Sequence, residues 1–466
     1  MSQLEQLANA YVIDLGGCPM ISFFRKLWRD KRGNALIIAA AALPLVIGSA
    51  GLASDTIQWA LWKRQIQRAA DSGAIAGVYS IVENSGGRTG VSDAVTRDML
   101  YNSHIKYTVT KNVGQPTGTY ASDIYAVQVQ LSVQQKLGFS GMFLNYIPTI
   151  TATGVATVVP SGHYCVISLE NTASTGITAT GNADVDLGCG MITNSTSLTA
   201  AVATGSSDVN ASPIAAVGGI PASTHWASGT QLMPFTMAQE DPYAAINAPA
   251  STTFPSGNCT QFPNDNPHDV HDASYWVAGT YSAMTGASAG AMCFRGDISI
   301  QGSVTFPAGS VIVLDGGSLS VGSQGTLNCD GCTFVLTNRD TSSTATIGNM
   351  DFNAGATLNL KAPGTSATGI AATYQGILVY QDRRAQDGTN SNQQSRMNGN
   401  ASSFLQGSLY FPKQQVTFNG TAGMSTQCFQ LVARRVYYSG TMNISNSCPS
   451  DSGAHDFTGK KVRLVA

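Results

Sequence analysis

The chain contains 466 residues with a net charge of −2, and only 11% of its residues are charged, against roughly 25% in an average soluble domain. This length allows two or three domains with sizeable buried cores. The lack of a basic surplus argues against a nucleic-acid partner, and a hydrophobic content of 43% excludes a largely disordered chain. Few charges and 49 glycines favour short strands joined by tight turns.

Residues 1–34 are predicted to form a cytoplasmic N-terminal segment. Its first 19 residues carry no basic run, so we expect Met20 to be the true start, with an ordinary N-terminal tail as the alternative. Cations directly before a membrane span keep that end of the chain in the cytoplasm. Five such cations precede residue 35: Arg25, Lys26, Arg29, Lys31 and Arg32.

Residues 35–54 are predicted to cross a membrane as a single helix. The stretch from Ala35 to Ala53 carries no charge and is just long enough for a hydrocarbon core of about 30 Å. Pro44 is tolerable inside such a helix. The alternative is a cleaved signal peptide, for which SAGLAS at 49–54 offers a passable site, but the long apolar run favours a retained anchor.

Residues 55–160 are predicted to form a helical stalk and a small α+β domain. Apolar residues at helical spacing continue past Asp55, and a second helix is expected over 92–105. Alternating apolar residues predict strands at 124–133 and 149–159. A run of small residues either allows another helix to approach closely or belongs to a stalk without a partner: Ala69, Ala70, Gly73, Ala74 and Gly77.

The sequence DKRGNALIIAAAALPLVIGSAGLASD, followed by RQIQRAADSGAIAGV, resembles the N-terminal segment of the TadE/TadG-like family of Flp (tight-adherence) pilus-assembly proteins. The resemblance covers about residues 21–160. It implies a bacterial inner-membrane protein whose partners are other pilus-assembly or pseudopilin proteins. Pseudopilins of this family carry a Glu five residues after the cleavage-site Gly, but Ile38 occupies that position after Gly33. The chain therefore fits the anchored, TadG-like branch rather than a fibre subunit.

Many TadG-like proteins end in a von Willebrand factor A domain, which binds a metal through a DxSxS motif after a hydrophobic strand. The comparable segment here is CVISLENTASTG, in which Glu170, Asn171 and Ser174 do not make that motif. We therefore expect neither a metal site nor a cofactor.

Residues 161–466 are predicted to form a right-handed parallel β-helix, so the fold class is mainly β. Short units recur in which small polar residues alternate with Val, Ile, Leu or Phe; Ser299 and Ser320 are 21 residues apart, and Gly181 and Gly205 are 24 apart. A period of about 20–25 residues suits one coil of a solenoid, with a β-sandwich as the alternative. Residues 213–292 interrupt the repeats and are predicted to be an insertion folded over one face. Pieces such as GDISIQGSVTFPAGSVIVLDGGSLSV and CFQLVARRVYYSG resemble the C-terminal part of a subset of Tad-like proteins.

Two polar segments are candidate sites. DNPHDVHD at 265–272 holds imidazoles and carboxylates that can share a cation, but its Pro and Asn residues favour a solvated loop. VYQDRRAQDG contains Asp382, Arg383, Arg384 and Asp387, the kind of set that β-helix enzymes acting on polysaccharides use. The recognisable signatures of those enzymes are missing, so a corner loop with an Asp–Arg pair is favoured.

Eight of the nine cysteines follow residue 160, and an even set on the translocated side predicts disulfides. They are Cys165, Cys189, Cys259, Cys293, Cys329, Cys332, Cys428 and Cys448. Connectivity does not follow from sequence, and our hypothesis is sequential pairing. The CDGC sequence at 329–332 is either a redox pair or a structural clip on an Asp-Gly turn, and the flanking strand-like residues favour the clip.

The sequence as a whole favours a membrane-anchored, non-enzymatic component of Flp pilus assembly that presents an extracytoplasmic β-helix to a partner or surface. A surface adhesin or structural surface protein independent of the pilus is the main alternative. A carbohydrate-active enzyme is a third interpretation, which depends on the geometry around Asp382 and Asp387.

Overall fold

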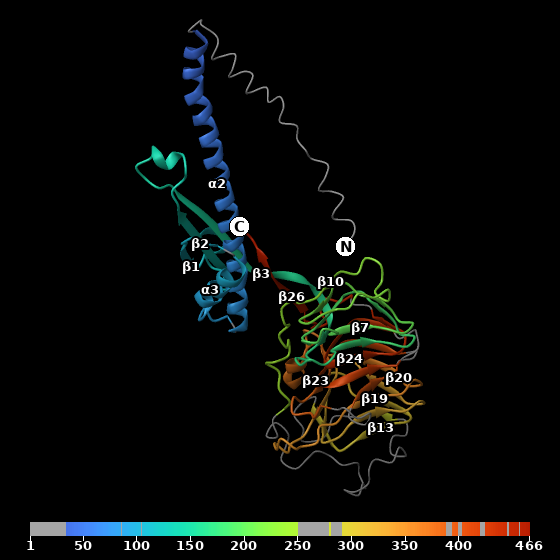
Figure 1. Cartoon of the computed structure of the whole chain (residues 1–466). Coiled ribbons are helices and arrows are strands. Elements are labelled where there is room, and N and C mark those ends of the chain that lie inside the picture. The colour runs from blue at the N-terminus through green and yellow to red at the C-terminus, as the bar shows by residue number, and fades with distance from the viewer. Residues whose placement is uncertain are drawn as a thin grey trace. The chain divides into compact units, whose positions relative to one another are not determined.

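The structure is a computed structural model, shown in Figure 1, and it describes residues 34–84, 86–103, 105–249, 279–280, 291–387, 394–398, 403–419, 425–444, 447–455 and 457–466. The chain divides into two compact units. Unit 1 comprises Met1–Val158 and Val462–Ala466, and unit 2 comprises Val159–Lys461.

Unit 1 is organised around one long helix, α2 (Asn34–Glu83). The helix contains Pro44 and continues without a break past residue 54, where the predicted membrane span ends. Its two halves differ in environment, because apolar side chains are exposed in the first half and small or aliphatic ones are buried in the second. The buried set consists of Ile66, Ala69, Ala70, Ala74, Val78 and Ile81.

The second half of α2 packs in unit 1 with a short helix, α3 (Val91–Asn102), and an antiparallel sheet. The sheet contains β1 (Thr110–Gly114), β2 (Val127–Gln134) and the first part of β3 (Thr149–Ser168), with β2 in the centre. Side chains of β2 alternate between buried and partly exposed, as expected of a strand with one face on a core. The buried face consists of Val127, Val129, Leu131 and Val133. Two 3-10 turns, η1 (Gly118–Tyr120) and η2 (Ser140–Met142), lie in the connections.

Gly154 sets how closely the sheet of unit 1 approaches α2. A Cβ atom on this residue would lie 2.7 Å from the carbonyl carbon of Ala70 and 2.8 Å from its oxygen. Both are backbone atoms of the helix, so neither can move aside without displacing it. Only glycine permits this approach of strand and helix.

Most strands of unit 2 are short and pair in parallel with the strand three positions later in the chain. The first ladder contains β12 (Ala291–Arg295), β15 (Val311–Asp315), β18 (Thr333–Thr337) and β21 (Ile377–Gln381), and continues through β23 (Phe404–Phe418), β24 (Ser425–Tyr438), β3, β6 (Gly190–Thr193), β9 (Ile214–Ala216) and β10 (Leu232–Met233).

Two further sets of strands pair in the same way. The second ladder contains β13 (Ile298–Ile300), β16 (Leu319–Val321), β19 (Met350–Phe352), β22 (Ser395–Met397), parts of β23 and β24, β4 (Ile177–Ala179) and β7 (Ala201–Ala203). The third contains β11 (Gly279–Thr280), β14 (Ser303–Thr305), β17 (Thr326–Cys329), β20 (Thr357–Lys361) and the first parts of β23 and β24. A small sheet joins β25 (Met442–Ile444), β5 (Asp184–Leu187) and β8 (Asp208–Asn210). The last strand is β26 (Phe457–Leu464).

The order of the strands in the stack differs from their order in the chain. β24, near the C-terminus, pairs with β23 on one side and with β3 and β4 on the other. The first strands of unit 2 thus lie in the middle of the stack, whose two ends are formed by β10 and by β11 to β13 (Figure 1). The chain between β10 and β11 therefore connects the two ends.

The main core of unit 2 is lined by one face of each ladder. The first ladder is also buried on its other face, where η5 (Gly369–Tyr374) and residues 237–248, here called the covering segment, pack against it. Mostly strand structure, one long apolar helix and a large parallel sheet were all predicted from the sequence and are confirmed. The predicted repeat of 21 residues is visible directly, because Ser299 pairs in register with Ser320.

We expect Gly154→Val to destabilise unit 1 by about 1–3 kcal/mol, because the new side chain overpacks the contact with the α2 backbone. Hydrogen exchange of the full chain, read from β2 peptides by mass spectrometry, should accelerate by roughly 5- to 150-fold. The matched control is Gly114→Val, because Gly114 is also a strand glycine that pairs with β2 and a Cβ there meets nothing within 4 Å. Equal exchange in the two variants would contradict this account of Gly154.

Candidate functional site

The first half of α2 exposes a continuous apolar surface. None of the apolar stretch that qualifies this helix as a membrane span is buried. Water does not stabilise such a surface, and a hydrocarbon environment does. The helix is therefore a membrane-spanning candidate by length, composition and exposure. The large apolar side chains exposed in this half are Ile37, Ile38, Leu43, Leu45, Val46, Ile47, Leu52 and Ile57.

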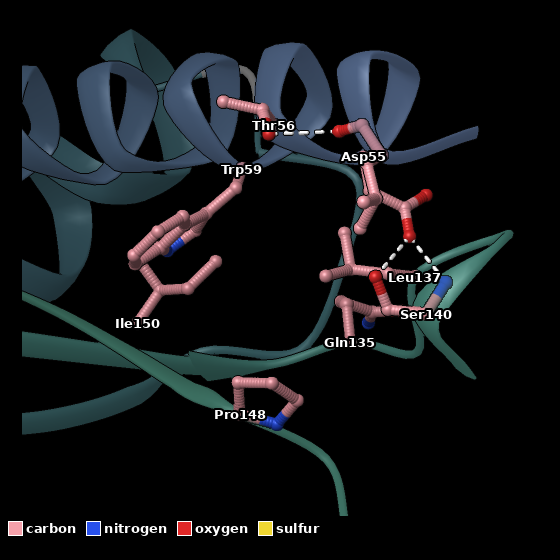
Figure 2. Close-up of a pocket in the computed structure, with 9 residues that line it drawn as sticks. Asp55, Thr56, Trp59, Gln135, Leu137, Ser140, Pro148 and Ile150 are labelled. Atoms are coloured by element: carbon pink, nitrogen blue, oxygen red, sulfur yellow. Dashed lines mark hydrogen bonds between the residues drawn. The ribbon is translucent and has the colours of Figure 1, made fainter. Parts of the chain in front are cut away.

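A cleft of about 220 Å³ lies in unit 1 beside Leu52 and Asp55 of α2, where the predicted span ends (Figure 2). One wall is α2, and the other is formed by the connection between β2 and β3 and by the start of β3. Asp55 is 6% exposed, and its carboxylate accepts hydrogen bonds from the backbone N–H and the hydroxyl of Ser140. The lining residues are Leu52, Asp55, Thr56, Trp59, Gln135, Leu137, Ser140, Pro148 and Ile150.

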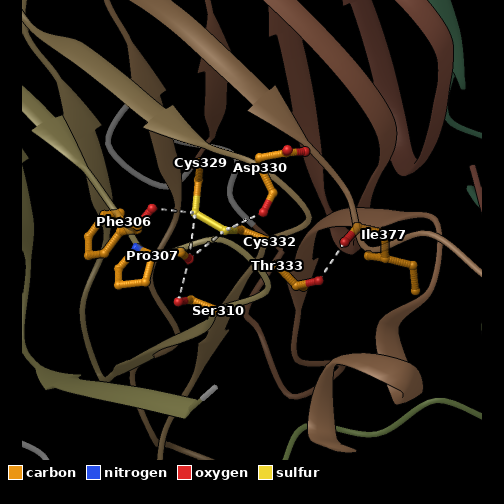
Figure 3. Close-up of a disulfide and its surroundings, with 8 residues drawn as sticks. All are labelled: Phe306, Pro307, Ser310, Cys329, Asp330, Cys332, Thr333 and Ile377. Atoms are coloured by element: carbon orange, nitrogen blue, oxygen red, sulfur yellow. Dashed lines mark hydrogen bonds between the residues drawn. A yellow bond between two sulfur atoms is a disulfide. The ribbon is translucent and has the colours of Figure 1, made fainter. Parts of the chain in front are cut away.

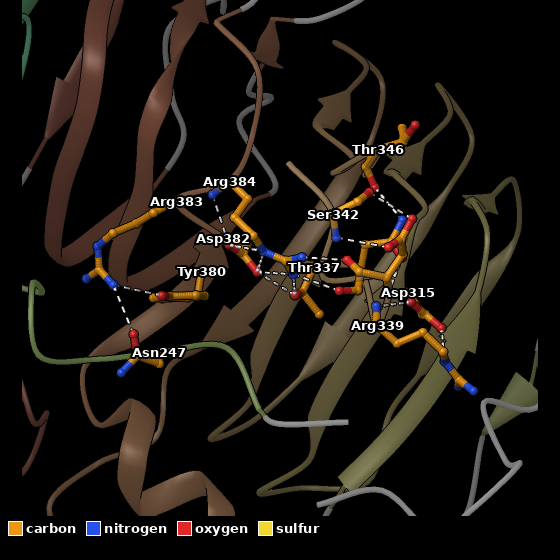
Figure 4. A network of polar contacts seen from close by, with 12 residues as sticks. Asn247, Asp315, Thr337, Arg339, Ser342, Thr346, Tyr380, Asp382, Arg383 and Arg384 are labelled. Carbon is orange, nitrogen blue, oxygen red and sulfur yellow. Dashed lines mark hydrogen bonds and ion pairs between the residues drawn. The ribbon is translucent and has the colours of Figure 1, made fainter. Parts of the chain in front are cut away.

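In unit 2, Asp382 and Arg384 form a closed ion pair directly after β21 (Figure 4). The Arg384 guanidinium lies 2.8 Å from the Asp382 carboxylate, which also accepts a 2.7 Å bond from the Thr337 hydroxyl. Burial raises the pKa of Asp382, but the hydrogen bonds from Arg384 and Thr337 outweigh it and lower the pKa. A carboxyl that acts as a general acid must hold a proton near neutral pH. Asp382 is therefore suited to fixing a turn rather than to acid catalysis.

Arg383 points away from Arg384 and fastens the covering segment to the first ladder (Figure 4). Its guanidinium donates a 2.7 Å bond to the carbonyl of Ile246 and a further bond to the carbonyl of Tyr243. It also lies over the Tyr410 ring at 5.4 Å and pairs with Asp241 at 3.5 Å. Each of these partners belongs to the covering segment or to the ladder beneath it, so Arg383 joins the two.

Asp387, the fourth candidate, belongs to a separate network of four charges. Its carboxylate pairs with Arg434 at 3.1 Å and with Arg435 at 2.5 Å. The same two arginines pair with Glu170, whose side chain is fully buried, at 3.0 and 2.7 Å. Asp382 and Asp387 thus pair with different arginines, and the structure does not bring them into one shared constellation.

The Glu170 carboxylate is also bound by the backbone N–H and the hydroxyl of Thr172, at 3.0 and 2.7 Å. Burial raises the pKa of Glu170, but hydrogen bonds from Arg434, Thr172 and Arg435 outweigh burial and lower the pKa to about 2. Sequence reasoning noted Glu170 only as part of a missing metal motif. Its arginine partners are more than 260 residues away in the chain, so no local pattern reveals this network.

The segment 265–272, predicted as a solvated loop or cation site, lies outside the described residues. Within the described ranges, no group of three His, Cys, Asp or Glu side chains is placed to hold a metal ion.

Three of the four hypothesised cysteine pairs are at disulfide distance. The Cα–Cα separations are 5.8 Å for Cys165–Cys189, 5.8 Å for Cys329–Cys332 and 4.3 Å for Cys428–Cys448. Cys293 is buried in β12, and its hypothesised partner Cys259 lies outside the described residues.

The CDGC turn lies between β17 and β18, and both of its sulfur-bearing residues are buried (Figure 3). The sulfur atom of Cys332 lies 3.6 Å from the carbonyl of Pro307 in the neighbouring connection. A redox pair needs an accessible thiolate to attack its substrate. This burial favours the clip over the redox pair.

We expect Glu170→Gln to destabilise the protein by about 3–5 kcal/mol at pH 7, because it removes one partner from a buried ion network. The folded-state pKa of about 2 lies below the ordinary value of 4.5. The contribution of Glu170 is therefore complete above about pH 4.5 and is lost as the pH falls toward 2. Thermal unfolding of the full chain in detergent, followed by circular dichroism, should show a difference between variant and wild type that shrinks over this window.

The matched control is Asp351→Asn, which removes an exposed carboxylate paired with Arg396 at 3.8 Å. Such pairs contribute only about 0–1 kcal/mol, so its unfolding temperature should stay near that of the wild type. An equal effect of both variants, or a Glu170→Gln difference that does not depend on pH, would show that the network does not stabilise the fold.

We expect non-reducing peptide mapping of the protein, purified from its native compartment, to show the pairs 165–189, 259–293, 329–332 and 428–448. Reduction should lower stability by about 2–4 kcal/mol for each bond, because the unfolded chain gains freedom. Free thiols at all eight positions would contradict both the pairing and an oxidising compartment.

The comparisons with known proteins bear on the helix of unit 1. Searches of curated proteins and of solved structures gave no significant match. Residues 33–80 match the family described as "Putative Flp pilus-assembly TadE/G-like". The matched residues include both the exposed apolar half of α2 and most of its buried half. The chain therefore carries a TadE/G-like Flp pilus-assembly domain at residues 33–80, as its sequence predicted.

Proposed function

We propose that this protein is a membrane-anchored, non-enzymatic component of Flp pilus assembly in the bacterial inner membrane. The observation that carries the proposal is the match of residues 33–80 to a pilus-assembly family, on a helix whose first half exposes many large apolar side chains. Residues 35–54 are the span, and other pilus-assembly or pseudopilin proteins are the partners. The role is that of an anchored presenting protein, not of a fibre subunit.

The proposed orientation places the N-terminus in the cytoplasm and both folded units on the far side. Five cations precede the span, and their translocation is unfavourable. The cysteine pairs support the same orientation, because disulfides persist in oxidising compartments such as the periplasm. On this proposal, unit 2 is periplasmic or extracellular.

We further propose that the three ladders of unit 2 close into a right-handed parallel β-helix. Most strands from β3 to β8 and from β11 to β20 pair with the strand three positions later, which supports this, since such pairing returns the chain to the same ladder once per coil. A stack of this kind resists bending because every coil is hydrogen-bonded to the next. It would present a stiff, mostly polar surface to a partner.

The state of the charged side chains supports a non-enzymatic role. Asp382 is paired with Arg384, Asp387 with two arginines, and Arg383 with backbone carbonyls. A carboxylate that exchanges protons with a substrate must have a position free for it. The hydrogen bonds of these side chains instead join parts of the fold to one another.

The test is complementation of a strain that lacks the gene. We expect the deletion to reduce piliation and attachment, and the wild-type gene to restore both. The double variant Leu43→Arg/Leu45→Arg should fail, because each arginine at the centre of a span costs about 2.5–3.5 kcal/mol. Leu100→Arg is the matched control, since Leu100 is 73% exposed and Leu45 is 75% exposed, but Leu100 lies on α3 outside the span.

The fraction of each variant that sediments with membranes is measured in the same strains, and alkaline phosphatase fused after Pro160 reports the orientation. Normal piliation and attachment in the deletion strain would overturn the pilus assignment. An inactive phosphatase fusion would overturn the orientation, whatever the piliation result.

A further inference from the structure

The loop that connects β2 and β3 in unit 1, residues 135–148, exposes an unusual amount of apolar surface. From Leu137 to Pro148 its sequence, LGFSGMFLNYIP, has no charged residue. Met142, Phe143 and Tyr146 are each two-thirds exposed or more, and Leu144 and Ile147 are also exposed. A soluble surface rarely gathers this many large apolar side chains without a partner.

The loop is fixed in place by the buried carboxylate of Asp55 on α2 (Figure 2). Besides its two bonds from Ser140, this carboxylate accepts a 3.1 Å bond from the backbone N–H of Phe139. An ionised acceptor of several short hydrogen bonds holds a loop more firmly than neutral contacts do. The exposed side chains are thus presented from a defined position beside the helix.

Aromatic packing continues the attachment from the helix to the exposed tip. A Cβ on Gly51 would lie 2.3 Å from the ring of Phe139, so this ring rests directly on the α2 backbone. The centroid of the Phe139 ring is 5.1 Å from that of Phe143, which is exposed. The helix, the half-buried ring of Phe139 and the exposed ring of Phe143 therefore form one continuous contact.

The level of this contact along α2 coincides with the end of the span. A helix rises about 1.5 Å per residue, so residues 35–54 extend about 30 Å, the thickness of a hydrocarbon core. Gly51 and Asp55 lie at the far end of that length. Trp59, exposed and one turn further along, marks the same boundary, since tryptophan favours the membrane–water interface.

We propose that the 135–148 loop inserts into the interfacial region of the same bilayer that α2 crosses, as a second membrane attachment of unit 1. The proposal rests on the proposed membrane span and deepens it. The occupant is lipid because the apolar surface of the loop continues that of the span, at the depth where headgroups meet acyl chains. The loop carries one charge, on the exposed Lys136 at its start, and none from Leu137 to Pro148, so the part that inserts has no charged group to desolvate.

The consequence is that unit 1 has a fixed orientation on the membrane. A single span lets the attached domain rotate about the helix axis and tilt. A loop held to that helix and inserted beside it selects the face of unit 1 that meets the bilayer. The opposite face of unit 1 is then the one available to other assembly proteins.

The test measures immersion depth by spin labelling of the purified full chain in nanodiscs of phosphatidylethanolamine and phosphatidylglycerol. Single cysteines are introduced as Phe143→Cys, Leu45→Cys and Leu100→Cys in a Cys18→Ser background. Leu100 is the matched control, because it is exposed but lies far from the proposed membrane boundary. Its neighbour Asp98 accepts a hydrogen bond from Ser72, and Ser72 lies about 25 Å along α2 from Asp55. Collisions of each label with oxygen and with a water-soluble nickel complex are compared by electron paramagnetic resonance.

We expect the labels at 143 and 45 to be protected from nickel and accessible to oxygen, and the label at 100 to show the reverse. Exposure at 143 with protection at 45 would overturn the loop insertion and leave the span standing. Exposure at both would overturn the span as well. Because the nanodisc holds only lipid, nickel exposure at 143 is also the result expected if the loop instead binds a protein.

A second variant tests the role of Asp55 as a positioning residue. Asp55→Ala should increase nickel exposure at 143 and leave the label at 45 unchanged, because only the loop loses its attachment to α2. Asp71→Ala is the control, since Asp71 lies on the same helix and accepts a bond only from a neighbouring helix residue, Gln67, among its described side-chain contacts. Unchanged depth at 143 in Asp55→Ala would show that Asp55 does not position the loop.

Discussion

The parallel pairing of β24 with β3 and β4 is the contact on which the order of unit 2 depends. One group of strands, β3 to β10, extends from this seam in one direction, and β11 to β23 extends in the other. Backbone bonds cross the seam from Leu169 to Ala433, from Glu170 to Arg434 and from Val436 to Gly176. The buried network of Glu170 with Arg434 and Arg435 lies at the same place. Without this pairing, the two groups would be separate stacks, each with an exposed strand edge.

The seam also explains why a long connection is needed between the two ends of the stack. Since the first strands of the unit lie in the middle, the chain must travel from β10 at one end of the stack to β11 at the other. Within its described part, the covering segment is hydrogen-bonded to the ladder, because the backbone of Gln239 both donates to and accepts from the Asn194 side chain. The ring of Tyr243 packs against that of Tyr410, with 5.3 Å between the ring centroids. Tyr380 then bonds the carbonyl of Ile246. Burial raises the pKa of Tyr380 to about 12, so the hydroxyl remains a donor at physiological pH.

Sequence reasoning succeeded where the signal is local or periodic. The uncharged stretch of α2, the alternation in β2 and the 21-residue step from Ser299 to Ser320 each follow from the spacing of residues along one segment. The sequences of first-ladder strands also differ from those of second-ladder strands in how their apolar residues are spaced. VIVLD and TFVLT are buried on both faces, whereas LSV and MDF alternate.

The features that sequence could not provide are those that join distant segments. Glu170 finds its arginines across more than 260 residues, and Asp55 finds Ser140 across 85. Neither residue type nor spacing indicates such partners, because ion pairs and hydrogen bonds between distant segments produce no periodic pattern in the sequence. β1 was also missed, since TKNVG has only one aliphatic side chain and forms as an edge strand by pairing with β2. Tertiary context decided its state.

The continuity of α2 has a mechanical consequence for the proposed role in pilus assembly. The helix has no break between its exposed apolar half and the half that carries Ile66 and Val78 into the core of unit 1. A break there would let unit 1 swing freely, whereas a regular helix bends little over a few turns. Gly154 brings the sheet directly onto the backbone of the same helix at Ala70. On the proposed span, a tilt of the part of α2 that follows Pro44 would be transmitted to the sheet, so the membrane would set the direction in which unit 1 faces.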